Sequence, residues 1–532
     1  MKHVHAFLSV LAIASIAPWF GCASDSSEAG YSPIDGFTTG DPGAGMSSGG
    51  EGGGTPLPPE EELESNYSAP VATGNYVWIA NPTSGRVAYI NATTLEVNVV
   101  EAGNAPTYVA AIPDANADVA IVLNVLSYDA TILRANGSNL TAESLPVPSS
   151  GNGWSVAKGG RWAIAWTDAR RIEMADPIDG FQDITVLDLK TGAMKSTPLT
   201  VGYRPVAVAF DQAETRAFAI TQDGISVVAL DGSAPVVVKN IKLTDMPSPD
   251  ATTRDVAITP DGSYALVRPD GANAVHVFSL VDGSRTDVFL PSAATDLDLS
   301  PDGSVAVAVV RDTRQVALLP VPGIVADPIN FPLVDIPNAT IGSASLAAKS
   351  PLALLYTNAV PNPVLTLLDT SAPAPNPRQI QLWAPVKAVF PTEDAAHAVV
   401  VHEAGGTIGS EYPAAMSIVP IANDLPAKLT GLDAPVISVA VSPSGHEALV
   451  ATGDEMHPQY RLYYASMPSL EVKKVQLASQ PIAAGIVAGA ERGYVAQKHP
   501  DGRITFVDFQ TGSVRTLTGF ELASQVIDGS NP

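Results

Sequence analysis

The stretch 255–267, DVAITPDGSYALV, decides the fold of this chain. Apolar residues alternate with other residues on both sides of a central Thr-Pro-Asp-Gly, and alternation with a period of two is typical of β-strands. Proline presets φ for one turn position, aspartate hydrogen-bonds the local backbone, and glycine accepts the position with positive φ. The stretch therefore predicts a β-hairpin with a tight turn.

The same hairpin recurs along the chain, for example as LDLSPDGSVAVAVV at 297–310 and VAVSPSGHEALV at 439–450. A third alternating strand follows each hairpin, and then a turn such as DLKTG at 188–192 or DFQTG at 508–512 leads into a fourth strand. The predicted first strands start near residues 107, 154, 206, 255, 296, 343, 386, 436 and 482. A spacing of about 47 residues is that of a four-stranded propeller blade.

These units predict an all-β chain that forms a single large β-propeller of about nine or ten four-stranded blades. A partial unit at 76–101 opens the propeller without a first strand of its own. The tail at 521–528, ELASQVID, is expected to supply that strand and close the ring, which would remove the open sheet edges. A smaller ring with embellished blades is the alternative.

The Ser/Thr-Pro-Asp-Gly turns, the alternating third strands and the Asp-x-x-Thr-Gly turns resemble the YVTN family of bacterial propeller repeats. The resemblance extends from about residue 76 to the end of the chain. It implies a propeller fold. It implies a surface or periplasmic binding protein in many cases, and a lactonase-like or metal-assisted enzyme in a few.

The composition supports short strands and argues against several functions. Apolar residues make up 46% of the 532 residues, and Gly and Pro number 43 and 45, which suits strands joined by many turns. The formal net charge is −25, so phosphate backbones are repelled and we expect no nucleic-acid partner. Cys22 is the only cysteine, which excludes an internal disulfide and a thiolate zinc cluster.

The N-terminus predicts export. A short basic start precedes the apolar run FLSVLAIASIAPWF at 7–20, which is too short to span a bilayer but suits a signal peptide. Gly21 and Cys22 follow, and this segment resembles a bacterial lipoprotein signal. The resemblance implies that residues 1–21 are removed and that Cys22 carries a membrane lipid anchor, with Ala23 favouring the outer membrane, on its periplasmic or surface side. An ordinary secretory signal with an incidental cysteine is the alternative.

The segment between the anchor and the propeller has the composition of a linker. Residues 22–66 are rich in Gly, Ser and Pro and show no apolar periodicity, so they cannot form a core. A flexible linker of this length spans roughly 35–40 Å. We therefore expect a signal peptide at 1–21, a disordered linker at 22–66 and the propeller at 67–532.

Candidate ligand-binding residues come from the loops between second and third strands, which gather around one end of the channel in a propeller. Three of these loops are long: 167–183, 402–413 and 452–458. Together with the shorter loop 498–501, they offer a candidate ligand-binding rim of Arg170, Arg171, Glu173, His402, Glu403, Asp454, Glu455, His457 and His499. For any single residue, a solvated loop is the simpler interpretation.

The sequence gives little support for catalysis or for a cofactor. It contains no Gly-x-Ser-x-Gly elbow and no HxH, HxxxH or HExxH pattern, so we predict no catalytic residues, no metal and no cofactor. Asp176, Asp179 and Asp183 leave a calcium loop open as an alternative. The leading hypothesis is an envelope-tethered binding or scaffold lipoprotein that engages a protein or envelope ligand. The alternative is a lactonase-like or metal-assisted hydrolase, which would need His402, Glu403, His457 or His499 to converge.

Overall fold

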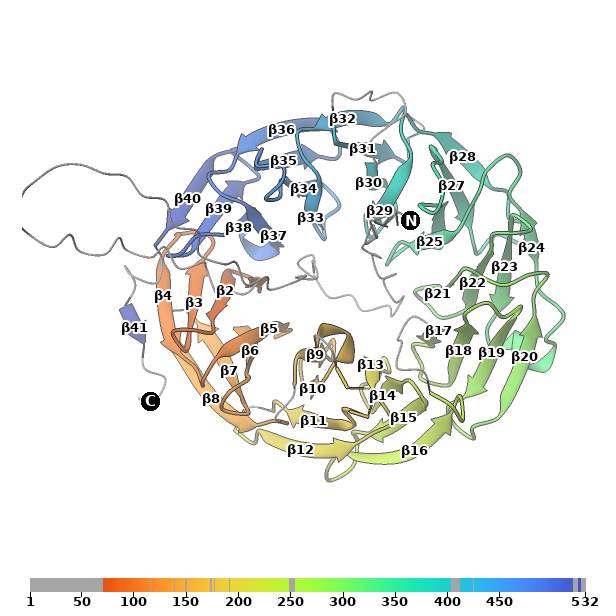
Figure 1. The fold of residues 1–532 in the computed structure, drawn as a ribbon, viewed down its shortest axis with the longest axis horizontal. Coiled ribbons are helices and arrows are strands. Elements are labelled where there is room, and N and C mark those ends of the chain that lie inside the picture. Colours follow the sequence, from red (N-terminus) through yellow and green to blue (C-terminus); the bar gives the residue numbers. More distant parts are fainter. Residues whose placement is uncertain are drawn as a thin grey trace, which may run out of the picture.

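The computed structural model describes residues 70–519 and 525–527, apart from 115, 138, 149–150, 173–174, 177, 191, 248–253, 403–411 and 424. The predicted signal peptide, Cys22 and the linker lie outside the described residues. The described chain folds into ten antiparallel sheets, one for each blade, arranged in a ring (Figure 1). Among the described residues, no helix is both long and apolar enough to cross a membrane.

Blades 1 to 5 follow one another in chain order, each with its first strand innermost (Figure 1). Their strands are β1 (Val71–Ala72), β2 (Tyr76–Asn81), β3 (Arg86–Asn91) and β4 (Val97–Glu101); β5 (Pro106–Ile112), β6 (Asp118–Asn124), β7 (Asp129–Asn136) and β8 (Asn139–Pro146); β9 (Gly153–Val156), β10 (Trp162–Trp166), β11 (Asp183–Asp188) and β12 (Lys195–Thr200); β13 (Pro205–Phe210), β14 (Arg216–Thr221), β15 (Gly224–Ala229) and β16 (Val236–Lys242); and β17 (Arg254–Ile258), β18 (Tyr264–Pro269), β19 (Ala274–Ser279) and β20 (Arg285–Phe289).

Blades 6 to 10 repeat the same plan. Their strands are β21 (Asp296–Leu299), β22 (Val305–Val310), β23 (Gln315–Pro320) and β24 (Leu333–Asp335); β25 (Ser343–Leu346), β26 (Leu352–Tyr356), β27 (Val364–Asp369) and β28 (Arg378–Gln381); β29 (Val386–Pro391), β30 (His397–His402), β31 (Ala414–Pro420) and β32 (Lys428–Leu432); β33 (Val436–Val441), β34 (Glu447–Thr452), β35 (Arg461–Ser466) and β36 (Glu471–Gln476); and β37 (Pro481–Val487), β38 (Arg492–Gln497), β39 (Arg503–Asp508) and β40 (Val514–Thr518). Short helical turns include η1 (Ala169–Arg171), α1 (Gly323–Ala326) and η4 (Ala488–Ala490).

The predicted fold class is confirmed, and the blade count is ten. The first strands of blades 2 to 10 begin at residues 106, 153, 205, 254, 296, 343, 386, 436 and 481, within one residue of the predicted positions. The alternative of a smaller ring with embellished blades is wrong, because every unit forms a sheet of its own, with five strands in blade 1 and four in each of the other nine blades.

The turn that decides the fold has the predicted chemistry. Gly262 has a φ of 65°, a left-handed conformation that glycine adopts without strain. The Thr259 hydroxyl oxygen accepts hydrogen bonds from the backbone N–H groups of Ser263 and Tyr264, at 3.1 and 3.0 Å. The Asp261 carboxylate also accepts from the Ser263 N–H, at 3.0 Å. These bonds satisfy the turn backbone and fix the register of β17 against β18.

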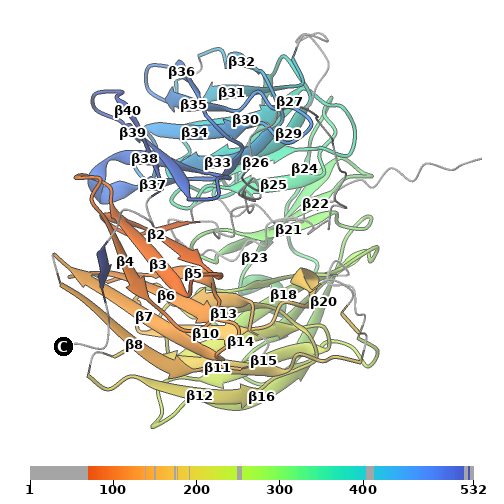
Figure 2. The same ribbon diagram turned by 60° about the vertical axis from the view of Figure 1, so that its left-hand side comes forward.

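The hydrophobic core lies between neighbouring blades, which stack face to face around the ring (Figure 2). One cluster joins Phe218 and Ile220 of blade 4 to Val267 and Phe278 of blade 5. Because a second strand buries apolar side chains on both faces, these strands read as continuous apolar runs, such as VAVAVV in β22.

The ring closes differently from the prediction. The short strand β1 supplies the first strand of blade 1, and blade 10 packs against that blade through a shared core cluster. The Tyr494 hydroxyl donates to the Pro70 carbonyl at 3.3 Å, and Arg492 donates to the carbonyls of Ala92 and Thr93 at 2.5 and 3.0 Å.

The prediction that the tail supplies the missing first strand is wrong. The tail strand β41 (Gln525–Ile527) pairs in parallel with β4, as a fifth and outermost strand of blade 1. The chain leaves blade 10 from its outermost strand, β40, so the nearest free edge of blade 1 is also the outer one.

Candidate functional site

The antiparallel order of each blade sorts its connections onto two sides of the ring. We call one side the loop face: it carries the loops between second and third strands, such as 453–460 and 498–502, and the inter-blade loops, such as 382–385. The other side, the turn face, carries the Pro-Asp-Gly turns and the turns between third and fourth strands. Every candidate residue that the structure describes belongs to the loop-face end of its blade.

Arg170 and Arg171 lie in η1 and fasten blade 3 to its surroundings. Arg170 forms a bidentate pair with the buried Asp168, with both N–O distances at 2.8 Å, and also donates to the Val206 carbonyl of blade 4 at 2.9 Å. Arg171 donates to the Asn152 carbonyl at 3.1 Å. Both guanidinium groups therefore have a structural role in holding the loop. Glu173 lies outside the described residues.

A buried arginine occupies the place considered for calcium. Arg204 is 5% exposed, and its guanidinium donates to the carbonyls of Asp179 and Asp176 at 3.0 and 2.5 Å. The rings of Tyr203 and Phe181 lie 5.5 and 5.9 Å from the same cation. The guanidinium thus brings a positive charge against the backbone of the loop for which calcium was the alternative, which disfavours a cation there. The described residues contain no group of three or more His, Cys, Asp or Glu side chains placed to hold a metal ion.

His402 lies inside blade 8 rather than on the rim. The side chain is 1% exposed, with Nδ1 3.2 Å from the Pro385 carbonyl oxygen and Nε2 2.7 Å from the Ser417 hydroxyl oxygen. Because the carbonyl can only accept, we infer that Nδ1 carries the proton and that Nε2 accepts from Ser417. Burial lowers the pKa of His402, so the ring is neutral near pH 7. Neither nitrogen is left for a ligand.

The position of His402 recurs in other blades. It is the last residue of the second strand, and the equivalent Asn124 and Gln497 are also buried. Each bonds a hydroxyl on the third strand: Asn124 donates to Thr131 at 2.8 Å and Gln497 donates to Thr505 at 2.7 Å. A polar residue here satisfies the interior of the blade, which explains why a histidine at this position need not serve a ligand.

The remaining candidates meet on blades 9 and 10. The Asp454 carboxylate accepts from the His457 backbone N–H at 2.7 Å and lies 2.9 Å from His457 Nδ1. Glu455 pairs with Lys498 of blade 10 at 3.3 Å, and His499 Nδ1 accepts from a backbone N–H at 3.2 Å. The structure brings these four candidates onto neighbouring loops, while Arg170 and Arg171 belong to blade 3. Glu403 lies outside the described residues. His402 is buried with both ring nitrogens engaged, and among the described residues it does not join the other candidate histidines.

Sequence reasoning missed a cavity of about 480 Å³ on the loop face, between blades 7 and 8. Its most exposed large side chain is Trp383, at 53%. His402 bonds the carbonyl of Pro385, one of the lining residues, and so positions this wall of the cavity. In the sequence, the three prolines of the lining are typical turn residues. They belong to two separate loops, so the sequence does not show that they share a cavity. The lining consists of Pro361, Pro363, Gln381, Leu382, Trp383, Ala384 and Pro385.

Unsatisfied buried polar atoms also concentrate towards this face. Among the described residues, five buried side-chain atoms have no hydrogen-bond partner: Asn124 Oδ1, Gln222 Oε1, Arg311 Nε, Thr366 Oγ1 and Thr452 Oγ1. Four of these residues end or directly follow a second strand, and Thr366 is the third residue of a third strand. All five therefore lie at or near the loop-face ends of their strands. Buried polar groups are rarely left unpaired, so each needs an explanation such as a bound water or ligand.

Acidic residues are buried in the inner strands of blades 5 and 6. Arg268 Nε lies 2.5 Å from the Asp255 carboxylate, and the Asp296 carboxylate accepts from the Ala344 N–H of blade 7 at 2.7 Å. Burial raises the pKa of Asp296 to about 6. Burial, with the charges of Asp296 and Asp255, raises the pKa of Asp298 well above its ordinary value. Asp298 is 9% exposed and forms no hydrogen bond with its side chain among the described residues.

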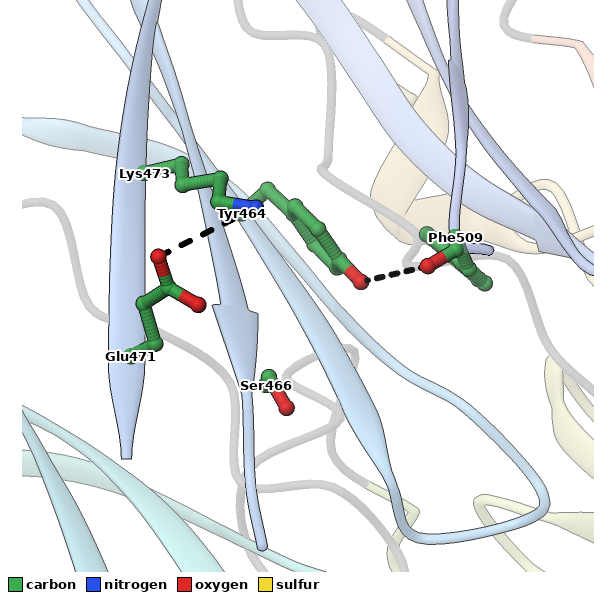
Figure 3. Close-up of a pocket in the computed structure, with 5 residues that line it drawn as sticks. All are labelled: Tyr464, Ser466, Glu471, Lys473 and Phe509. Atoms are coloured by element: carbon green, nitrogen blue, oxygen red, sulfur yellow. Dashed lines mark hydrogen bonds and ion pairs between the residues drawn. The ribbon is translucent and has the colours of Figure 1, made fainter. Parts of the chain in front are cut away.

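A second, smaller cavity lies on the turn face between blades 9 and 10 (Figure 3). Its volume is about 160 Å³, and it is lined in part by Tyr464 and Phe509, whose rings stack at 5.3 Å. The Tyr464 hydroxyl donates to the Phe509 carbonyl at 3.3 Å, and Lys473 lies 3.8 Å from Glu471 (Figure 3). These polar groups satisfy one another, so the loop face is the stronger candidate.

These features define the chain as a ten-bladed β-propeller with a polar loop face. No protein-family model matches the chain, and no curated protein matches it. A solved structure described as the eukaryotic initiation factor is 14% identical, with a TM-score of 0.50, over 77% of this chain and 94% of that one. Another, the dihydro-heme d1 dehydrogenase NirN in complex with DHE, is 14% identical, with a TM-score of 0.42, over 68% and 73%. At identities this low, the likeness to these structures is one of fold alone.

Proposed function

We propose that this chain is an exported, lipid-anchored binding protein whose propeller presents the loop face to a protein or envelope ligand. The anchor in this proposal is Cys22, and the linker at 22–66 holds the ring clear of the outer membrane. The propeller fold supports a binding role in general terms. The proposed location in the cell envelope rests on the N-terminal sequence.

The observation that carries the proposal is the placement of unsatisfied polar atoms. Five buried atoms without partners lie at or near the loop-face ends of their strands, in blades 2, 4, 6, 7 and 9. The cavity with the half-exposed Trp383 opens on the same face. An exposed aromatic side chain at a cavity, with buried polar atoms that lack partners in the strand ends beneath the same face, favours the loop face as the binding surface.

The binding role is tested by capture from envelope fractions with the purified chain as bait. Trp383→Ala removes the exposed aromatic side chain of the loop-face cavity, and we expect a tenfold or greater loss of the captured partner. Phe289→Ala is the matched control, because Phe289 is 69% exposed but lies on the outermost strand β20. Equal capture by wild type and Trp383→Ala, or equal losses in both variants, would contradict a cavity-centred site.

The anchor is tested separately in a bacterial host. We expect wild-type protein in the membrane fraction with an acylated N-terminal cysteine by mass spectrometry, and Cys22→Ser in the soluble fraction. An unacylated mature protein in the soluble fraction would support the ordinary secretory signal instead. Capture by the loop face would be unaffected by that result.

A further inference from the structure

Arg311 stands apart from other arginines at the loop-face ends of the blades. It directly follows β22 in blade 6, and its Nε is buried without a hydrogen-bond partner. Across the part of the chain that the structure describes, its guanidinium forms no hydrogen bond or ion pair. By contrast, Arg170, Arg268 and Arg461 lie 2.8, 2.5 and 3.1 Å from a carboxylate oxygen.

The guanidinium lies against the junction of blades 6 and 7. A Cβ on Gly342 would lie 2.8 Å from Arg311 Nη2 and 3.1 Å from Nε, so the absence of a side chain at Gly342 lets the cation rest on the backbone. The same point is 3.2 Å from the Thr357 hydroxyl oxygen, so Gly342 lies between blade 6 and the second strand of blade 7. Thr357 is 1% exposed, and its oxygen accepts from the Ala359 N–H at 3.3 Å.

Two acidic residues of blade 6 form hydrogen bonds with groups other than Arg311. The Asp312 carboxylate accepts from the Ser292 hydroxyl at 2.9 Å, and Asp296 accepts from the Ala344 N–H at 2.7 Å. A half-buried guanidinium with an unpaired N–H has lost hydration without gaining a partner, which is unfavourable. An external anion that contacts the exposed part of the guanidinium would supply a partner, against the overall repulsion of a chain with a net charge of −25.

We propose that Arg311 binds a carboxylate of the ligand on the loop face. This inference rests on the proposed function and names its ligand chemistry. One guanidinium matches a single carboxylate. We expect a singly charged carboxylate to be preferred to a dianionic phosphate, because the net charge of the chain is −25 and repels a dianion more strongly. The carboxylate belongs either to a small free acid or to a Glu or Asp side chain of a protein partner.

The test measures binding of two probes to the full chain by calorimetry: glutarate, and a short peptide with several Glu residues. Arg311→Gln should weaken binding of at least one probe about tenfold or more. Arg515→Gln, which removes the same charge from the exposed outer strand β40, should leave it unchanged. Binding of glutarate identifies a free acid as the source, and binding of the peptide alone identifies an acidic partner.

A site-specific readout comes from the Nε–H resonances of labelled arginine, with Arg311 assigned by its absence from the Arg311→Gln spectrum. The Arg311 signal should shift when the probe is added. Absence of binding by both probes, equal losses in Arg311→Gln and Arg515→Gln, or tighter binding of inorganic phosphate would overturn the carboxylate site. Envelope capture that survives Arg311→Gln but is lost in Trp383→Ala would overturn it and leave the proposed function standing.

Discussion

Asp298→Asn should stabilise the ring increasingly as the pH rises from 4 to 6. In the folded protein the pKa of Asp298 is raised well above 3.8, by burial and by the charges of Asp296 and Asp255. The folded state therefore keeps a proton that the unfolded chain releases above pH 3.8. Each pH unit between these two pKa values lowers the free energy of unfolding by about 1.4 kcal/mol.

Asparagine replaces the protonated carboxyl group with a neutral amide of nearly the same shape. The variant therefore lacks the decrease in free energy of unfolding that Asp298 causes as the pH rises. Asp298 makes no side-chain hydrogen bond among the described residues, so the substitution breaks none there. The two proteins should thus differ little at pH 4. As the pH rises from 4 to 6, the variant should gain up to about 1.4 kcal/mol relative to wild type for each pH unit over which folded Asp298 keeps its proton.

The assay is urea unfolding of both proteins at half-unit intervals from pH 4 to pH 6. Asp296, with a pKa of about 6, also lowers the free energy of unfolding as the pH rises, in the wild type and in the variant. The lowered pKa values of His276, His397 and His402 act in the opposite direction and also cancel in the comparison. A difference in free energy that stays constant with pH would refute the account of a buried, protonated Asp298.

Three further perturbations test the architecture. Arg204→Met should remove the hydrogen bonds that Arg204 donates to the carbonyls of Asp176 and Asp179, cost about 1–3 kcal/mol in urea unfolding and speed proteolysis of the 167–182 loop; unchanged proteolysis would contradict this role. Arg492→Ala should cost about 1–3 kcal/mol, since it removes hydrogen bonds from blade 10 to blade 1, and a neutral effect would argue against this closure. A chain truncated after residue 519 should keep the wild-type unfolding midpoint, because β41 is only an outermost addition; a large drop would restore a closing role to the tail.

The sequence predicts the fold well because each blade encodes its own boundaries. Turns such as the one ending at Gly262 mark where strands stop, and alternating apolar residues mark which faces are buried. The role of the tail is not encoded in this way. The edge of blade 1 that the tail joins depends on where the chain leaves blade 10. It also depends on β1, which already fills the inner edge of blade 1. With only two residues, Val71 and Ala72, β1 is too short to be recognised in the sequence.

The candidate site is less predictable because exposure depends on position within a blade. His402 looked like a loop residue, yet it ends β30 and points into the blade interior. Arg204 carried no signal in the sequence, since its partners are backbone carbonyls from a preceding loop. Arg311 is singled out by missing partners, and a missing partner becomes visible only when all neighbours are placed.

Hydrogen exchange of the ring with and without its captured envelope partner tests the central claim most directly. The account predicts that slowed exchange concentrates on the loop face, at 357–363 and 382–385, which border the cavity and Arg311. The turns around Gly262 and Gly303 on the opposite face should exchange at the same rate in both states. Protection confined to those turns would contradict the assignment of the loop face as the binding surface.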